Sequence, residues 1–362
     1  MPQDAFILEK DHLVPLLRRL GRDRRLVAPV RNGYGDTLYA PVTDLEEDGL
    51  DLEARPQNSL KGFFFPQRER LFSYTVAPDT GGGHRYAFET HLPEERPTVY
   101  FGVRSCDLFG VLYCDLVFLK GRRRDAYYQR RRAGAVFATL ACHHPFAGCF
   151  CNATRTGPSL ELGFDLQLFD LGDRFYVETG KPGGAEIVAR WPAFFQPAGE
   201  PDRQAQFQAA LEARGLFERK IHVDLAVGLL AGREPEGVVR RLSERCQDCG
   251  GCAFVCPTCT CFTITDQPLD EHHGERVRTW DACTFSGFTR MAGDANPVDG
   301  ATERVRRRFL HKLRHDVARH GRPSCVGCGR CLGICFGGVD MARFVEMVCS
   351  FGNHHATDED AR

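Results

Sequence analysis

Short apolar runs and helix-spaced leucines alternate in the first half of the chain. Residues 97–103 (PTVYFGV) and 135–142 (AVFATLAC) are apolar and rich in β-branched and aromatic side chains, which predicts two buried strands. Leucines four residues apart predict a helix over 104–120, and a second helix is predicted over 124–134. Two strands joined by helices predict a parallel βαβ unit and therefore a mixed α/β fold.

Two further patterns flank this unit. Helical spacing of leucines predicts a helix over 11–21, with Gly21 as the residue that ends it. Residues 164–180 alternate apolar and polar side chains on both sides of 171–173 (LGD), which predicts a β-hairpin with its turn at these residues. Both patterns extend the predicted α/β body beyond the βαβ unit.

The distribution of proline, glycine and cysteine divides the chain into two predicted domains. Residues 181–202 are rich in proline and glycine and are predicted to be a loop-rich linker. Residues 203–245 have helical spacing and lead directly into a dense group of cysteines. We therefore expect a mixed α/β domain over 1–200 and a second, cysteine-rich domain over 201–362.

Composition and charge exclude several classes of protein. With 43% hydrophobic and 26% charged residues and a formal net charge of −1, the chain has an ordinary globular composition and lacks the basic excess of a nucleic-acid binder. No run approaches the length of a membrane span, and the N-terminus lacks the apolar region of a secretory signal. We therefore expect a cytoplasmic protein, in which seventeen cysteines indicate metal binding rather than disulfides.

Two copies of one cysteine motif lie in the second half of the chain. The first copy has the form C-x2-C-x2-C-x3-C-P, and the second has the same spacing with Phe336 in place of the proline. The motif cysteines are Cys246, Cys249, Cys252 and Cys256 in the first copy, and Cys325, Cys328, Cys331 and Cys335 in the second. This spacing is typical of proteins that bind two [4Fe–4S] clusters.

The reach of the chain determines which cysteine binds which cluster. Three thiolates spaced three residues apart can surround one cluster, whereas the fourth, four residues further on, points away and binds the other cluster. The predicted ligands are Cys246, Cys249, Cys252 and Cys335 for the first cluster, and Cys256, Cys325, Cys328 and Cys331 for the second. A pair of zinc sites is the alternative, although zinc usually uses two C-x2-C pairs with a longer spacer.

Four upstream cysteines form a candidate third metal site. They are Cys106, Cys142, Cys149 and Cys151. Cys106 follows one predicted strand and Cys142 ends the other, so parallel strands place both thiols at the carboxyl edge of the sheet, where α/β folds bind ligands. The loop that carries the other two can fold over them. We favour a third [4Fe–4S] cluster over buried structural thiols, and a zinc site with His143 or His144 is a further alternative.

Most of the remaining cysteines are predicted to have structural roles, and one has no assigned role. Cys259 and Cys261 follow the first motif too closely to be needed as ligands, so we expect them to pack beside a cluster. Cys283 can lie near a cluster, and its role is open. Cys114 and Cys349 lie in apolar helical segments and are predicted core residues.

Residues 303–320 form a strongly basic predicted helix. One interpretation is a solvated face, which is the usual role of a run of charge. The other is that its arginine and lysine side chains offset the negative charge of the clusters, raise their potentials and steer an acidic partner. The pattern alone leaves both interpretations open.

The motifs CQDCGGCAFVCPTCTCF, RTWDACTFSGF, RVRRRFLHKL and CVGCGRCLGIC occur in this order, after FGVRSCDL and ACHHPFAGCFC. Over roughly residues 60–345 the chain resembles the beta subunit of sulfhydrogenases and, equally, the electron-transfer subunit of anaerobic sulfite reductase. The resemblance implies that the domain over 201–362 is mainly α-helical and ferredoxin-like. It also implies a protein that carries electrons between a catalytic partner and a flavin- and NAD(P)-binding subunit. The catalytic partner is a NiFe hydrogenase in one branch and a sirohaem sulfite reductase in the other.

We therefore expect an iron–sulfur electron-transfer subunit with no active site of its own. The chain has no G-x-G-x-x-G turn between a strand and a helix and no P-loop, so we do not expect it to bind NAD or flavin itself. We favour the hydrogenase as the catalytic partner and keep the sulfite reductase as the alternative. A zinc-binding interaction module without a redox role is the alternative from another class.

Overall fold

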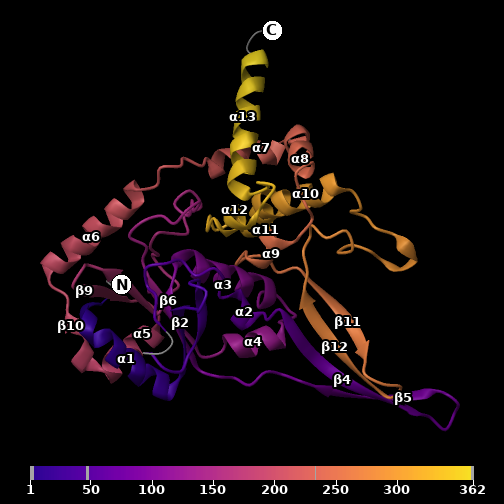
Figure 1. Cartoon of the computed structure of the whole chain (residues 1–362), viewed down its shortest axis with the longest axis horizontal. Helices are drawn as coiled ribbons and strands as arrows, with labels where there is room; N and C mark the ends of the chain where they lie inside the picture. Colours follow the sequence, from indigo (N-terminus) through magenta and orange to yellow (C-terminus); the bar gives the residue numbers. More distant parts are fainter. Residues whose placement is uncertain (1–3, 46–48, 233, 360–362) are drawn as a thin grey trace.

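The computed structural model describes residues 4–45, 49–232 and 234–359. The outermost residues of the two predicted domains, 1–3 and 360–362, lie outside this description. Figure 1 shows a body built around a mixed sheet, with the C-terminal helices above it and a long β arm that projects to one side. Within the described ranges, every helix is too short or too polar to traverse a lipid bilayer.

An eight-stranded sheet forms the centre of the body, with strand order β10-β1-β9-β8-β7-β6-β2-β3. Its strands are β1 (Ala5–Glu9), β2 (Arg25–Arg31), β3 (Thr37–Val42), β6 (Thr98–Val103), β7 (Ala135–Leu140), β8 (Leu166–Asp170), β9 (Arg174–Thr179) and β10 (Gln196–Pro197). The neighbours β2, β6, β7 and β8 run parallel to one another, and all other neighbouring pairs are antiparallel.

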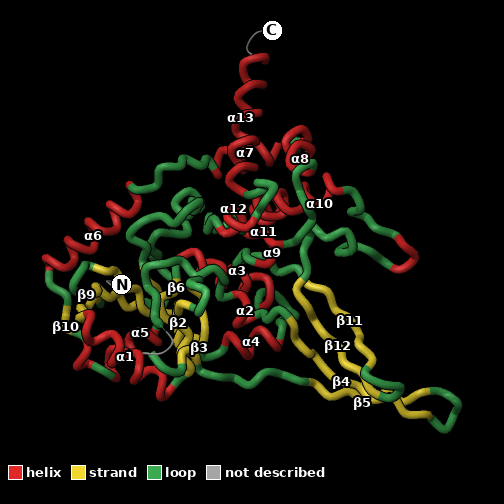
Figure 2. Tube along the Cα trace, in the orientation of Figure 1, coloured by secondary structure: helices red, strands yellow, loops and turns green. Residues whose placement is uncertain are grey.

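Helices cover both faces of this sheet, so the body has three layers (Figure 2). The helices on one face are α1 (Lys10–Asp23) and α5 (Pro182–Arg190), and those on the other are α2 (Lys61–Phe64), α3 (Ser105–Phe118) and α4 (Ala126–Arg132). Side chains of β6 alternate between the two cores, because successive residues of a strand point to opposite faces. Val99 and Phe101 pack with α1 and α5, whereas Tyr100 packs with the other three helices. Val103 packs on the same side as Tyr100, because the strand register shifts between Phe101 and Val103.

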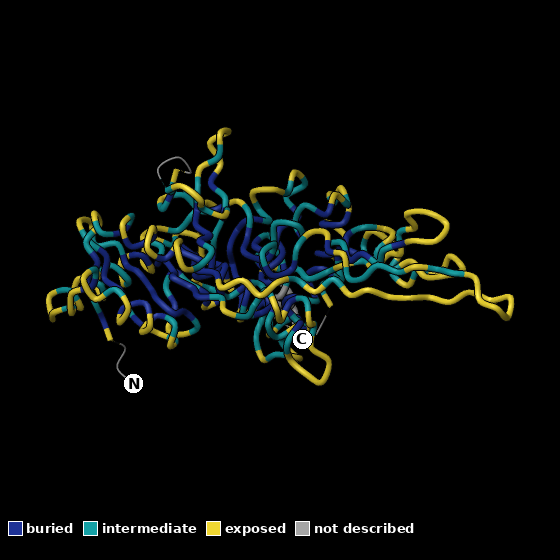
Figure 3. Tube along the Cα trace, turned by 90° about the horizontal axis from the view of Figure 1, so that it is seen from below, coloured by how far each residue is buried: buried dark blue, intermediate teal, exposed yellow. Residues whose placement is uncertain are grey.

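A four-stranded antiparallel sheet, with strand order β11-β12-β4-β5, forms the arm. Its strands are β4 (Arg68–Pro78), β5 (His84–Thr90), β11 (Phe262–Pro268) and β12 (His273–Trp280). Each half of the chain therefore contributes one hairpin to this sheet. Figures 1 and 3 show that the arm runs away from the body and that its outer end is exposed.

Helices surround two cysteine-containing loops in the C-terminal part. The α-helices there are α7 (Val223–Gly232), α8 (Glu236–Ser243), α9 (Gly251–Phe254), α10 (Ala301–Leu310), α11 (Asp316–His320), α12 (Arg330–Ile334) and α13 (Met341–Glu359). The helix before them, α6 (Glu200–Gly215), lies beside β9 of the large sheet. A π-helical segment, His311–His315, joins α10 to α11, and 3₁₀ turns occur at Pro192–Phe194 and Ala292–Asp294. Each cysteine motif begins in a loop and continues into a short helix, α9 or α12. Residues 201–362 thus combine helices with the β11–β12 hairpin.

Most of the predicted elements are confirmed. The predicted strands at 97–103 and 135–142 are β6 and β7, and they pair in parallel as the βαβ prediction requires. The two predicted helices between these strands are α3 and α4, and the predicted hairpin is β8–β9. Helix α8 leads directly into the first cysteine motif. The chain is therefore a mixed α/β protein with the cysteine motifs near its C-terminal end.

The predicted end of the first helix is wrong. Gly21 lies within α1, which continues to Asp23. The chain leaves the helix at Arg24, which is extended and donates its N–H to the carbonyl of Leu20. Gly21 keeps a helical backbone, so it does not supply the left-handed turn that a glycine cap requires.

The prediction of a loop-rich linker at 181–202 is also wrong in its first half, which forms α5. Pro182 starts this helix, and Ile187 and Val188 are buried against the sheet. A Cβ atom at Gly184 would lie 1.8 Å from the carbonyl oxygen of Asp165, so glycine here permits close packing of helix on sheet. The glycine-rich composition therefore reflects a contact rather than a flexible connection.

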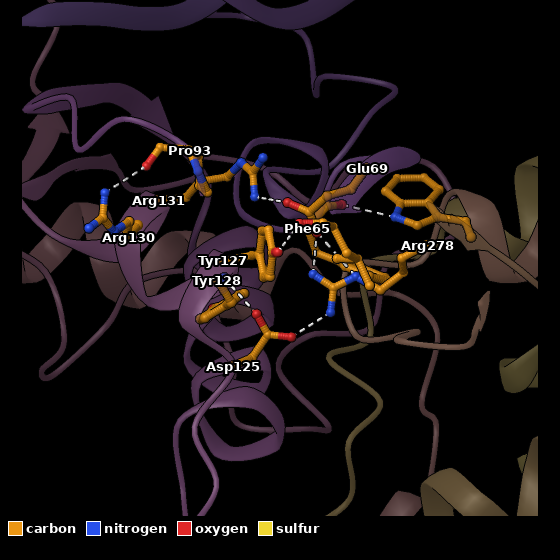
Figure 4. A network of polar contacts seen from close by, with 11 residues as sticks. Phe65, Glu69, Pro93, Asp125, Tyr127, Tyr128, Arg130, Arg131 and Arg278 are labelled. Carbon is orange, nitrogen blue, oxygen red and sulfur yellow. Dashed lines mark hydrogen bonds and ion pairs between the residues drawn. The ribbon is translucent and has the colours of Figure 1, made fainter. Parts of the chain in front are cut away.

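A buried ionic network attaches the arm to the body (Figure 4). Arg278 of β12 is 3% exposed and bonds Glu69 of β4, which is 4% exposed, with Nε 3.1 Å from Oε2. Arg278 also bonds Asp125, whose other oxygen accepts the Tyr128 N–H at the start of α4. Arg131 of α4 bonds Glu69 from the opposite side. One carboxylate thus joins both hairpins of the arm to a helix of the body.

Replacing Glu69 is expected to destabilise the protein strongly. Glu69→Ala leaves Arg278 buried beside Asp125 alone, and loss of one partner from a buried ion pair costs about 3–5 kcal/mol. We expect the free energy of unfolding, measured by urea denaturation, to fall by about 3 kcal/mol. Asp224→Ala is the control, because its ion pair with Arg155 is exposed and is worth less than about 1 kcal/mol. Equal effects of the two changes would contradict a role for the buried network.

Candidate iron–sulfur centres

The first of two cysteine-lined cavities lies beside α9, α10 and α12. Its walls include all four thiols predicted for the first cluster, namely Cys246, Cys249, Cys252 and Cys335. Gly250 turns the chain into α9 with a φ of 70°, and a Cβ there would lie 2.5 Å from the ring of Phe285. The structure therefore brings Cys335, at the end of α12, to the three thiols of the other motif.

The second cavity lies between α10, the loop before α12 and the loop that precedes β8. Its walls include the thiols predicted for the second cluster, namely Cys256, Cys325, Cys328 and Cys331. Gly327 and Gly329 have left-handed backbones, with φ of 59° and 74°. A Cβ at Gly327 would lie 2.6 Å from the backbone of Phe150, and one at Gly329 would lie 2.5 Å from that of Gly148. Glycine is therefore required where the motif loop packs against residues 148–151.

Each cavity thus gathers three thiols from one motif and the fourth from the other. This arrangement is required if the fourth cysteine of each motif binds the cluster of the other motif. The ligation itself stays a prediction. Cys252 and Arg308 line both cavities, so the two cavities share a wall. Sites that share a wall are close enough for electrostatic interaction between their occupants.

The donor set of these cavities fits iron–sulfur clusters. A cluster needs thiolates around a cavity, and backbone N–H groups that bond the sulfurs tune its potential. The N–H of Val339 donates to the Sγ of Cys335 at 3.1 Å, and that of Gly327 donates to the Sγ of Cys325 at 3.5 Å. Among the residues that the structure describes, no three His, Cys, Asp or Glu side chains converge closely enough to hold a single metal ion.

Burial keeps most of these thiols protonated in the absence of metal. It raises the pKa of Cys331 to about 12 and raises the pKa values of Cys252, Cys325 and Cys328 above the ordinary value. Thiols must lose their protons to bind metal, so cluster binding is opposed by protonation. The affinity of these cavities for a cluster therefore falls as the pH falls.

Buried cations of the basic helix face the cavities. Arg304, Arg308 and Lys312 are spaced four residues apart and are buried, whereas Arg306 and Arg307 are partly exposed. Arg308 lines both cavities and Lys312 lines the second, where its Nζ donates to the Thr258 hydroxyl at 2.8 Å. The helix therefore has a charged inner face beside the cysteines and a partly solvated outer face.

The four upstream cysteines also lie near one another, next to the second cavity. Cys106 is in the first turn of α3 and Cys142 follows β7, so the parallel strands deliver both to the same edge of the sheet, as predicted. Cys106 is 8% exposed and packs with Val326 and Cys328 of the second motif. A hydrogen bond from Cys151 lowers the pKa of Cys149 to about 7. Whether these thiols bind a third cluster stays a prediction.

A buried ion pair connects this upstream site to the second motif. Arg330, which lies between Cys328 and Cys331, donates to the carboxylate of Asp107 at 2.8 Å, and both side chains are buried. Asp107 follows Cys106 directly and also accepts the hydroxyl of Tyr39 at 3.1 Å. The ion pair therefore fixes the second motif against the carboxyl edge of the large sheet.

The other cysteines lie apart from the cavity walls or pair with one another. A hydrogen bond from Cys259 holds the pKa of Cys256 well below its usual value, which agrees with packing beside a predicted ligand. Cys261 and Cys283 form a hydrogen bond with each other, and their separation in sequence did not indicate this contact. The predicted core cysteines are Cys114, which bonds the carbonyl of Pro257, and Cys349, which bonds that of His222. Both are buried.

Sequence patterns missed one buried cation beside the thiols. Lys61 of α2 is buried, lies 3.8 Å from the centre of the Trp280 ring and donates to the carbonyl of Ala253 at 3.1 Å. Nothing in the sequence near Lys61 indicated this position, because α2 contacts the first motif only through the tertiary fold.

His143 and His144, the alternative zinc ligands, are exposed.

Comparisons with known proteins agree with this geometry. Residues 245–339 match a family described as a 4Fe-4S dicluster domain. Over 342 residues, which are 94% of this chain and 97% of the relative, the chain is 28% identical to sulfhydrogenase 2 subunit beta of Pyrococcus furiosus. The predicted resemblance to the sulfhydrogenase beta-subunit family is confirmed, and the chain carries a ferredoxin-like iron–sulfur domain at its C-terminal end.

The predicted binding of each motif's fourth cysteine to the other cluster can be tested by EPR spectroscopy. Cys335→Ser is expected to alter the same EPR signal of the reduced protein as Cys246→Ser, because both residues line the first cavity. Cys256→Ser is expected to alter the same signal as Cys325→Ser. If Cys335→Ser instead affects the signal that Cys325→Ser affects, each motif binds its own cluster and the exchange is wrong.

A third cluster at the upstream cysteines changes the iron content. We expect about twelve iron and twelve sulfide per chain in anaerobically purified protein, and about eight of each in Cys106→Ser. Cys114→Ser is the matched control, since Cys114 lies on the same helix and bonds a carbonyl rather than the other thiols. About eight iron and eight sulfide in the unaltered protein would show that the upstream thiols are structural.

Proposed function

We propose that this chain relays electrons between the catalytic subunit of a NiFe hydrogenase and a flavin- and NAD(P)-binding subunit. That it is an iron–sulfur electron-transfer protein is supported by both comparisons. The single observation that carries the relay is the row of three thiol sets. The first cavity shares Cys252 with the second, and Cys328 of the second packs against Cys106 of the upstream set.

The protein's own residues hold this row, and Cys249 is the only exposed thiol among its twelve cysteines. Bound clusters would supply one-electron transfer, while the thiols fix their positions and the buried cations offset their charge. The ion pair of Arg330 and Asp107 keeps the second motif in register with the upstream site. The row supports transfer through the protein from the side of Cys249 toward the large sheet, or in the reverse direction.

One end of the row lies at the surface. Cys249 is exposed, and Phe336, which follows Cys335 directly, is 95% exposed. Ile334 is also exposed, and both apolar side chains line the first cavity. An exposed aromatic residue beside a redox site suits contact with a partner subunit, because aromatic residues contribute strongly to interfaces. We infer that a partner subunit covers this rim.

The choice of catalytic partner rests on the relative. Its name identifies it as the beta subunit of a sulfhydrogenase, and the two chains match over nearly their full lengths. A match of this extent supports a place in a multisubunit hydrogenase. We therefore propose a hydrogenase as the partner rather than a sulfite reductase.

Purification of the intact complex tests this function. A tagged chain, isolated anaerobically with its partners, is expected to carry nickel- and flavin-containing subunits and to reduce methyl viologen with hydrogen. Sirohaem absorbance together with sulfite reduction would show instead that the catalytic partner is a sulfite reductase. Stoichiometric zinc without acid-labile sulfide would remove the redox role altogether.

Altering the exposed rim is expected to impair electron transfer within the complex. Phe336→Asp places a charge in the proposed interface, so we expect the hydrogen-dependent reduction of NAD(P) to fall roughly tenfold, equivalent to about 1.4 kcal/mol. Tyr34→Asp is the control, because Tyr34 is 94% exposed in the β2–β3 turn, far from the motifs in sequence. Unchanged activity in Phe336→Asp, with the EPR signals intact, would show that no partner covers the rim.

A further inference from the structure

We propose that Arg308 is a positioning residue shared by both cluster sites, and that its one positive charge sets the two reduction potentials together. The inference rests on the proposed function, because it requires a cluster in each cavity. It goes further in assigning one side chain to both sites.

The position of Arg308 carries the inference. Arg308 lies in α10, is 4% exposed and lines both cavities. Its Nη1 donates to the carbonyl of Val339 at 2.7 Å, which fixes the guanidinium in place. Its buried Nε has no hydrogen-bond partner in the described structure. An arginine has five N–H donors, so this fixed group retains donors for a ligand in the cavities.

The charge of Arg308 has no carboxylate to balance it. Among the ion pairs of the described residues, none contains Arg308, whereas its neighbour Arg304 pairs with Asp248 and Arg330 pairs with Asp107. A buried cation without an anionic partner is strongly unfavourable. Thiolate-ligated clusters in the two cavities would provide the negative charge that the protein itself does not.

This shared cation has a defined electrical consequence. Reduction adds one electron to a cluster and makes it more negative, so a nearby fixed cation favours the reduced form and raises the potential. Because Arg308 borders both cavities, its charge acts on both potentials. Lys312 differs, since it lines only the second cavity and its ammonium is held by Thr258. The two residues therefore predict two distinguishable patterns of shift.

Redox titration of the full chain, monitored by EPR, tests the inference. We expect Arg308→Gln to lower both midpoint potentials, each by a roughly tenfold change in the reduction equilibrium, or about 59 mV for one electron. Lys312→Gln is expected to lower the potential of the second cluster more than that of the first, because Lys312 lines only the second cavity. Arg307→Gln is the matched control, because it removes the same charge from the next residue of α10, which lines neither cavity.

The outcomes separate this inference from the proposed function. If the unaltered chain shows no cluster signals, the proposed function fails. If clusters are present and Arg308→Gln leaves either potential unchanged, only the shared role of Arg308 fails. Should Arg308→Gln hold less iron than the unaltered chain, Arg308→Lys replaces it in the titration. Because lysine keeps the positive charge, we expect both potentials of Arg308→Lys to stay close to those of the unaltered chain. A large fall in either potential, with both clusters present, would overturn the inference.

Discussion

Backbone lies directly against backbone where the second cysteine motif meets the loop at 148–151. The approach is so close that Gly327 and Gly329 leave no room for a Cβ atom, and both also need left-handed backbones. This contact joins the ferredoxin-like part to the α/β body, and the buried pair of Arg330 and Asp107 reinforces it. Alignment of the three thiol sets depends on it, because a shift of this loop would move Cys328 away from Cys106.

Charge balance is the second constraint on the same region. Arg308, Lys312 and Lys61 are buried beside thiols, and burial of cations is unfavourable unless anions accompany them. Burial also favours the neutral, protonated form of several of the thiols, so without clusters these thiols supply no negative charge to balance the cations. Thiolate-ligated clusters would supply that negative charge, which couples cluster binding to the stability of this part of the fold.

Local patterns predicted those parts of the protein that depend on neighbours in sequence. The βαβ unit, the β8–β9 hairpin and the cavity partners of the motif cysteines follow from periodicity and spacing. Contacts made by distant segments escaped prediction. The four-stranded arm pairs β4 with β12, and Gly184 permits α5 to pack on the sheet where composition suggested a linker. The four-residue spacing of Arg304, Arg308 and Lys312 was visible, but only the fold shows that this face is the buried one.

The arm has a consequence for the order in which the protein is made. Glu69 and Arg278 are 209 positions apart, so at about 5–20 residues per second the ribosome needs roughly 10–40 s to synthesise the partner of a carboxylate already made. During that interval the first hairpin has no neighbouring strand. The second cysteine motif emerges later still, so completion of both cavities, and hence assembly of either cluster, has to wait until Cys335 has been synthesised.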